Sequence, residues 1–141
     1  MSITRVLVAD GFQRWREVIC GLVENELHLS VLHSSSDGPD AVREAAHYQP
    51  DLVILDVDLP GLSGIEVAQQ LSQLSPRSKL LFLSMNIDPD IVRAAFEAGA
   101  HAYVLKADAA KDLLVAVQQV SAGRQFVSAA IARVLEPRTN E

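Results

Sequence analysis

The sequence is short of the features that mark several classes of protein. It has a single cysteine, Cys20, which excludes a disulfide within the chain and leaves no second thiol for a metal site. Positive charge is in the minority, with 12 Lys and Arg residues against 18 Asp and Glu residues and a formal net charge of -6. This balance argues against a chain that itself binds nucleic acid over a broad surface.

Long hydrophobic runs are also missing. No apolar run approaches the roughly 20 residues that a membrane-spanning helix requires, and the N-terminus lacks a basic start followed by a long apolar stretch. We therefore expect a cytoplasmic protein with no membrane partner. The chain does have 141 residues, of which 49% are hydrophobic, and this is enough for one compact domain with a real core.

Two kinds of segment alternate along the chain. Short β-rich runs are each followed by a stretch whose apolar residues recur at helical spacing. The expected strands cover residues 3–9, 30–35, 52–56, 79–84 and 102–106. The expected helices cover a first segment around residues 15–23 and then residues 40–48, 65–74, 91–98 and 111–122.

This alternation predicts an α/β fold, a doubly wound five-stranded parallel sheet with helices on both faces. Asp88 before Pro89 is typical of a helix start, and Gly99 and Gly123 lie where helices are expected to end. Residues 1–123 form the expected domain. Residues 124–141 are expected to be a C-terminal helical extension or the start of a linker.

Polar residues end four of the expected strands. These are Asp10, Asp56, Ser84 and Lys106, and Asp58 follows Asp56 two positions later. Because the carboxyl ends of parallel strands meet at one edge of a sheet, where ligands bind, we expect these side chains to share a site. Such a site would explain why the apolar run 52–55 leads directly into a carboxylate.

The combination of residues suggests a chemistry. Carboxylates that lie close together repel one another unless a hard cation such as Mg²⁺ sits among them. A lysine and a hydroxyl nearby would neutralise and orient the oxygens of a phosphoryl group accepted by an aspartate. No Gly-rich phosphate-binding loop is present, since "ADGF" at residues 9–12 fits neither common pattern, so nucleotide binding is not expected.

Four segments carry a family resemblance. They are "VLVADG" (6–11), "LVILDVDLPGLSG" (52–64), "LLFLS" (80–84) and "AYVLKA" (102–107). In this order and spacing they resemble the receiver domain of bacterial two-component response regulators, of the type attached to a helix-turn-helix output domain. The resemblance covers about residues 3–123 and implies a flavodoxin-like strand order of 2-1-3-4-5.

The resemblance also implies roles for single residues. Asp56 would be the phosphoacceptor, charged by a sensor histidine kinase or by a small donor such as acetyl phosphate. Lys106 would pair with the phosphoryl oxygens. Ser84 would turn to hydrogen-bond the phosphoryl group and Tyr103 would move inward behind it, so that residues 89–122 read out the change.

One position departs from the family pattern. Strand 1 of a receiver usually ends in two acids, the second a direct metal ligand, and here the pair is Asp10-Gly11. In one interpretation Asp10, Asp56 and Asp58 still bind Mg²⁺, more weakly than usual, with the Asp58 side chain restoring the lost charge. In the other, the chain is a pseudo-receiver that signals by dimerisation or partner binding without phosphorylation.

A phosphatase of the haloacid-dehalogenase type is the alternative from another class. Its signature would make Asp56 the nucleophile and Asp58 the general acid. However, that family places the signature on its first strand and needs a further acidic pair after the lysine. We therefore expect no enzyme activity beyond hydrolysis of the chain's own aspartyl phosphate.

The expected partners follow from the same resemblance. A homodimer is predicted through the apolar residues Ala95, Phe96, Ala98 and Tyr103, or through the first and fifth helices. DNA would be contacted only through an output domain that this chain lacks, so the chain is either a stand-alone receiver or a fragment. Ser128 is expected to cap a short helix in the tail. The four histidines are scattered without metal-ligand spacing and are predicted to lie on the surface or in loops.

Overall fold

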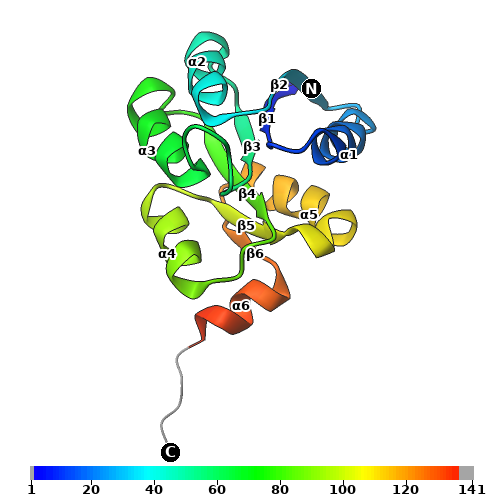
Figure 1. Ribbon diagram of the computed structural model, residues 1–141. Helices are drawn as coiled ribbons and strands as arrows, with labels where there is room; N and C mark the ends of the chain where they lie inside the picture. The colour runs from blue at the N-terminus through cyan, green and yellow to red at the C-terminus, as the bar shows by residue number, and fades with distance from the viewer. Residues whose placement is uncertain (1, 137–141) are drawn as a thin grey trace, which may run out of the picture.

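A six-stranded parallel sheet runs through the molecule, with helices on both sides (Figure 1). The computed structural model describes residues 2–136. The strands are β1 (Thr4–Ala9), β2 (Leu29–Ser35), β3 (Leu52–Leu55), β4 (Lys79–Ser84), β5 (Ala102–Leu105) and β6 (Phe126–Val127). The helices are α1 (Gln13–Glu24), α2 (Gly38–Tyr48), α3 (Gly64–Leu74), α4 (Pro89–Glu97), the 3-10 turn η1 (Lys106–Asp108), α5 (Ala109–Ser121) and α6 (Ala129–Leu135).

The sheet has the order β2-β1-β3-β4-β5-β6, so the expected order 2-1-3-4-5 is confirmed and the count of five strands is corrected. The additional strand, β6, is two residues long and pairs Phe126 with Ala102 and Val127 with Tyr103. So short a segment carries no alternation of its own. Its extended conformation comes from the edge of β5, to which it is hydrogen-bonded.

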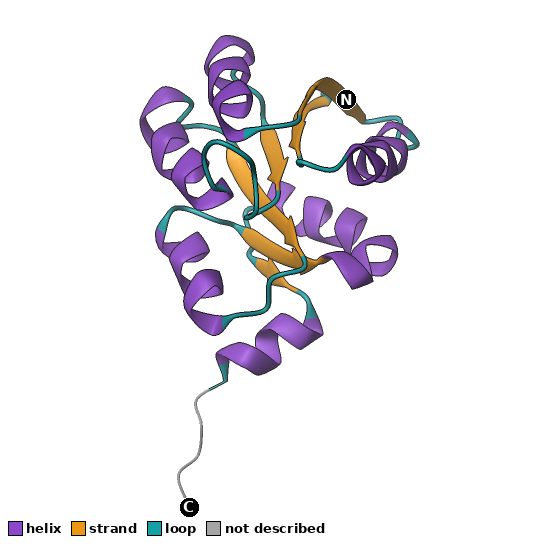
Figure 2. Ribbon diagram, in the orientation of Figure 1, coloured by secondary structure: helices purple, strands orange, loops and turns teal. Residues whose placement is uncertain are grey.

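The helices form two layers (Figure 2). Successive side chains along a strand point to opposite faces of the sheet. On β1, Leu7 and Ala9 join the core under α2, α3, α4 and α6, whereas Val6 and Val8 join the core under α1 and α5. Both faces are therefore covered, which explains why the central strand β3 is hydrophobic and buried at every position.

The helix ends follow from local chemistry. The side chain of Asp88 accepts a hydrogen bond of 2.8 Å from the Asp90 N–H, and Pro89 occupies the first turn of α4, so the predicted start is confirmed. Gly99 and Gly123 have φ angles of 110° and 82°, which residues with a Cβ rarely adopt. Both glycines follow helices, as expected. The expected bounds of α2 to α5 differ from the observed ones by two residues at most.

Helix α6 lies against α4 and β5, and this corrects the expected dimer surface (Figure 1). Ile131 of α6 is fully buried in the same core as Ala95 and Tyr103, which are themselves fully buried. Partly buried Phe96 packs against this core. The apolar residues predicted to form a dimer surface on α4 and β5 therefore pack within the chain.

Ser128 begins α6 but does not cap it with its side chain. Its Oγ instead accepts a hydrogen bond of 3.0 Å from the Leu105 N–H, and its own N–H donates to the Tyr103 carbonyl at 3.1 Å. The predicted position of Ser128 at the start of a short helix is therefore confirmed, but its side chain anchors the chain after β6 to the edge of β5 and does not cap the helix.

Residues 137–141, part of the expected extension or linker, lie outside the described residues. In the part that the structure describes, no helix is both long and apolar enough to cross a membrane.

Candidate functional site

The carboxyl ends of β1, β3 and β5 bring three charged side chains together. Asp10 and Asp56 directly follow β1 and β3, and Lys106 directly follows β5. They are 1%, 3% and 3% exposed, respectively. Lys106 Nζ lies 2.8 Å from Asp10 Oδ2 and 2.9 Å from Asp56 Oδ2. The predicted convergence of these residues at one edge of the sheet is therefore present.

The charges of this cluster do not balance. Two carboxylates share one ammonium group, which leaves a formal charge of one negative unit in a buried site. Buried ions are tolerated when they are paired and hydrogen-bonded. Asp10 Oδ1 accepts from the Phe12 N–H at 2.9 Å, and Asp56 Oδ1 accepts from the Asp58 N–H at 3.3 Å. The cluster can thus accept further positive charge.

Two aromatic rings cover the lysine, and sequence reasoning did not find this role for them. Lys106 Nζ lies 4.9 Å from the centroid of the Trp15 ring and 5.6 Å from that of Phe12. At these distances a cation is attracted to the face of a ring. Position 15 was predicted only to lie in the helical segment around residues 15–23. Its place in the first turn of α1, five positions after Asp10, was the available signal, but its partner after β5 is visible only in the fold.

Glycine at position 64 is required by the backbone of the phosphoacceptor candidate. A Cβ on Gly64 would lie 2.0 Å from the carbonyl oxygen of Asp56, and the Gly64 N–H donates to the Val57 carbonyl at 2.8 Å. The start of α3 therefore packs directly against the turn that presents Asp56. This close approach explains why glycine follows the aspartate by eight positions.

The donors at this edge fit a magnesium ion. The Asp10 Oδ2 atom is buried and has no hydrogen-bond partner, because its contact with Lys106 is an ion pair without hydrogen-bond geometry. The position that a Cβ on Gly11 would take lies 3.9 Å from the Asp58 carbonyl oxygen, so this carbonyl faces the position of the missing acid. Asp58 itself has an exposed side chain. Two carboxylates, a carbonyl and water form the all-oxygen set that Mg²⁺ prefers.

Ser84 and Tyr103, the predicted switch residues, both contact the loop after β4. Ser84 Oγ accepts from the Asn86 N–H at 3.1 Å, and the Tyr103 hydroxyl donates to the Asn86 carbonyl at 2.6 Å. Tyr103 is fully buried and stacks on Phe82, with ring centroids 6.0 Å apart. Burial raises the pKa of Tyr103 to about 12. Asn86 is thus the shared backbone partner of both hydroxyls.

Comparison with known proteins gives a consistent pattern. A family model described as a response regulator receiver domain matches residues 6–118. The chain is 36% identical over 130 residues to the transcriptional activator protein ExaE of Pseudomonas putida, which covers 92% of this chain and 61% of that protein. It is 30% identical over 128 residues to the transcriptional regulatory protein LiaR of Bacillus subtilis, which covers 91% of this chain and 61% of that protein.

A solved structure has the same arrangement over nearly the whole chain. The crystal structure of a two-component response regulator of the LuxR family from Aurantimonas sp. SI85-9A1 superposes with a TM-score of 0.90 at 30% identity, covering 95% of this chain and 96% of that one. The chain spans less than two thirds of the length of ExaE and LiaR. These findings give no support to the haloacid-dehalogenase alternative.

Proposed function

We propose that this chain, which belongs to the family of response regulator receiver domains of two-component systems, is switched by phosphorylation of Asp56. The single observation that carries it is the position of Asp56, buried at the carboxyl end of β3 with Oδ2 2.9 Å from Lys106 Nζ. This arrangement presents a carboxylate beside a fixed positive charge, which a transferred phosphoryl group requires.

The chemical step is the transfer of a phosphoryl group from a donor to Asp56. A carboxylate oxygen of Asp56 attacks phosphorus, and a new P–O bond forms as the bond from phosphorus to the donor breaks. The bonding electrons leave with the donor, which is the imidazole of a sensor histidine kinase or the acetate of acetyl phosphate. Lys106 would stabilise the negative charge that gathers on the phosphoryl oxygens.

Magnesium is part of the proposal. Asp10, Asp56 and the carbonyl of Asp58 would hold the ion, and the bound ion would neutralise charge on the phosphoryl oxygens. Because position 11 is glycine, one carboxylate fewer is available than in the usual family pattern. We therefore expect weak binding, with the exposed Asp58 side chain contributing charge to the site.

The switch would act through Asn86. In the structure the Ser84 hydroxyl accepts from the Asn86 N–H, and a hydroxyl that accepts one hydrogen bond can still donate its own proton. On phosphorylation Ser84 would donate to a phosphoryl oxygen, and the loop that also carries the hydrogen bond from Tyr103 would move. Since Tyr103 lies in the core that contacts α6, the change would reach the C-terminal end of the described chain.

Intact mass after incubation with acetyl phosphate tests the proposal. We expect a Mg²⁺-dependent gain of one phosphoryl group in the wild type and none in Asp56→Ala. A gain that persists in Asp56→Ala would place the phosphoryl group elsewhere. No gain at any Mg²⁺ concentration would favour the pseudo-receiver without phosphorylation. A generic phosphatase substrate should not be turned over, since the only hydrolysis expected is that of the aspartyl phosphate.

The remaining proposals concern location and partners. We propose that the chain acts in the cytoplasm and that a sensor histidine kinase is its phosphoryl donor. ExaE and LiaR are named as transcriptional regulators, and the chain spans 61% of each, so DNA contact is proposed only through an output domain outside these residues. Phosphotransfer from candidate kinases, compared by initial rate, would identify the donor.

A homodimer is proposed through α1 and α5. These helices lie side by side on one face (Figure 1), and each exposes a valine, Val18 at 48% and Val115 at 42%. Light scattering of the wild type and of Val18→Glu, with and without acetyl phosphate, tests this surface. A monomer at high concentration in every condition would overturn it.

A further inference from the structure

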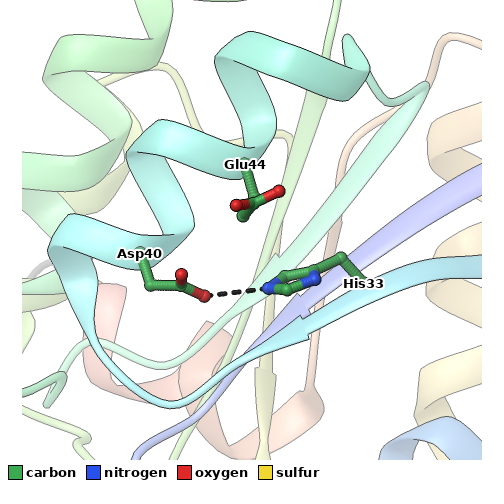
Figure 3. Close-up of side chains that lie close together, drawn as sticks. All are labelled: His33, Asp40 and Glu44. Carbon is green, nitrogen blue, oxygen red and sulfur yellow. Dashed lines mark hydrogen bonds and ion pairs between the residues drawn. The ribbon is translucent and has the colours of Figure 1, made fainter.

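We propose a binding site for a transition-metal ion between β2 and α2, outside the site around Asp56. Zn²⁺ is the probe for this site. Figure 3 shows its three side chains, His33, Asp40 and Glu44, directed toward one another. One ligand atom from each lies within 4.8 Å of the others. The juxtaposition of an imidazole on a strand with two carboxylates on the facing helix carries the inference.

The secondary structure explains why the three groups meet. Asp40 and Glu44 are four residues apart on α2, so their side chains lie on the same face of the helix, one turn apart. His33 and Ser35 are two residues apart near the end of β2, and alternate residues of a strand share a face. The packing of α2 on β2 then brings the imidazole under the two carboxylates.

The distances suit a small cation. His33 Nε2 already lies 2.8 Å from Asp40 Oδ2. Around Zn²⁺, ligand atoms at bond lengths near 2.1 Å stand about 3.4 Å apart in a tetrahedron, so only Glu44 has to approach further. Water would supply the fourth ligand. For the metal to bind, the His33 ring would be the neutral tautomer that carries its proton on Nδ1, which leaves the Nε2 lone pair free to ligate.

A second observation points to a ligand at this position. The Ser35 hydroxyl is fully buried and its Oγ has no hydrogen-bond partner. It lies near the Asp40 carboxylate without forming a hydrogen bond to it, and the hydrogen bond with His33 lowers the pKa of Asp40 below its usual value. A buried hydroxyl without a partner beside the three donors could hydrogen-bond a ligating carboxylate or the metal-bound water, as outer groups of metal sites do.

The choice of metal follows from the donors. An imidazole nitrogen with two carboxylate oxygens suits Zn²⁺ and its neighbours in the transition series, whereas Mg²⁺ prefers oxygen ligands alone. The site therefore differs in preference from the all-oxygen group around Asp56. Its occupation would tie the edge strand β2 to α2.

Arg43 is the group that competes with the metal. Its guanidinium pairs with Asp40 Oδ1 at 2.5 Å and with Glu44 Oε1 at 3.7 Å. The side chain is 66% exposed, so it can turn to solvent at little cost. Removal of Arg43 should therefore strengthen metal binding, which a purely structural role of the cluster would not produce.

Calorimetric titration of the metal-free 141-residue chain with ZnCl₂ tests the site. We expect one equivalent bound in the wild type, affinity lowered by about tenfold or more in His33→Gln and in Glu44→Gln, and affinity raised in Arg43→Gln. His47→Gln is the matched control, because His47 is also on α2 but outside the group, and its affinity should match the wild type. A thermal melt without metal checks that each variant is folded.

The opposite outcomes are equally specific. No binding by the wild type, or unchanged binding in His33→Gln, would overturn the site. Loss of Zn²⁺ binding in Asp56→Asn with retention in His33→Gln would place the metal at the phosphorylation site instead. Equal affinity for Mg²⁺ and Zn²⁺ would also contradict the assigned donors.

Discussion

Lys106 Nζ lies 2.9 Å from Asp56 Oδ2, and both residues are 3% exposed. The pair joins the end of β5 to the end of β3 across fifty positions of sequence. Because the same ammonium also contacts Asp10, the lysine is the only positive charge that these two buried carboxylates contact among the described residues. The site is therefore held together by a residue whose loss leaves its neighbours uncompensated.

Substitution of Lys106 by methionine should destabilise the fold. The variant keeps most of the side-chain volume but leaves Asp10 and Asp56 facing each other without a counter-ion, which costs about 3 kcal/mol in buried sites. Urea unfolding at pH 7 measures the free energy. Lys111→Met, at an exposed position of α5, is the control and should change stability little. Equal stability of the two variants would show that the buried carboxylates find other compensation.

Substitution of Gly11 by aspartate should strengthen Mg²⁺ binding. The new Cβ would lie 3.0 Å from Pro60 Cδ, so the proline ring must move by a few tenths of an ångström. The carboxylate of the new aspartate would face the Asp58 carbonyl. We expect affinity to rise on the order of tenfold, since one carboxylate ligand is added. Fluorescence of Trp15, the single tryptophan and a neighbour of Lys106, follows the titration.

Gly11→Asn separates charge from shape in this experiment. Its side chain is nearly the same size but neutral, so it should give a smaller gain than Gly11→Asp. If both variants bind Mg²⁺ as the wild type does, the ion does not sit next to position 11.

Substitution of Tyr103 by phenylalanine should cost about 1 kcal/mol at pH 7, because the hydrogen bond to the Asn86 carbonyl is lost. The difference should depend on pH. Burial raises the pKa of Tyr103 from 10.0 to about 12, so the unfolded chain loses the phenolic proton first. The stabilisation by tyrosine is fully present below pH 10 and is lost as the pH rises toward 12.

Urea unfolding of wild type and Tyr103→Phe at a series of pH values above 7 measures this change. Subtracting the unfolding free energy of Tyr103→Phe from that of the wild type at each pH removes the contribution of all other titrating groups. We expect the two stabilities to converge above pH 10. A difference that stays constant at high pH would mean that the tyrosine ionises as readily in the folded chain as in the unfolded one.

Substitution of Ile131 by alanine should destabilise the chain by about 2–4 kcal/mol, because a fully buried side chain of α6 would leave a cavity beside the core of α4 and β5. Arg133→Ala, at an exposed position of the same helix, controls for helix propensity. Thermal melts of both variants compare the effects. Equal melting temperatures would indicate that α6 is not docked on α4 in solution.

The spacing of apolar residues and the residues typical of helix ends were sufficient to predict much of the fold from the sequence. The apolar run 52–55 predicts a strand covered on both faces, and Asp88 with Pro89 predicts the start of α4, because each depends on a few neighbouring residues. The rule that parallel strands end at one edge then placed Asp10, Asp56 and Lys106 together. For the same reason the carboxylate after the apolar run 52–55 is explained, since the strand delivers Asp56 to that edge.

Contacts between distant segments could be decided only by the tertiary structure. Strand β6 and the docking of α6 depend on contacts with the edge of β5. The residues of these segments do not by themselves show the spacing that would predict such contacts. His33 was expected within the strand 30–35 but without metal-ligand spacing, and it lies beside Asp40 only because α2 packs on β2. The rings of Phe12 and Trp15 over Lys106 have the same origin. The local sequence determines the conformation of each segment. Which side chains meet is determined by the packing of the apolar helix faces against the two faces of the sheet.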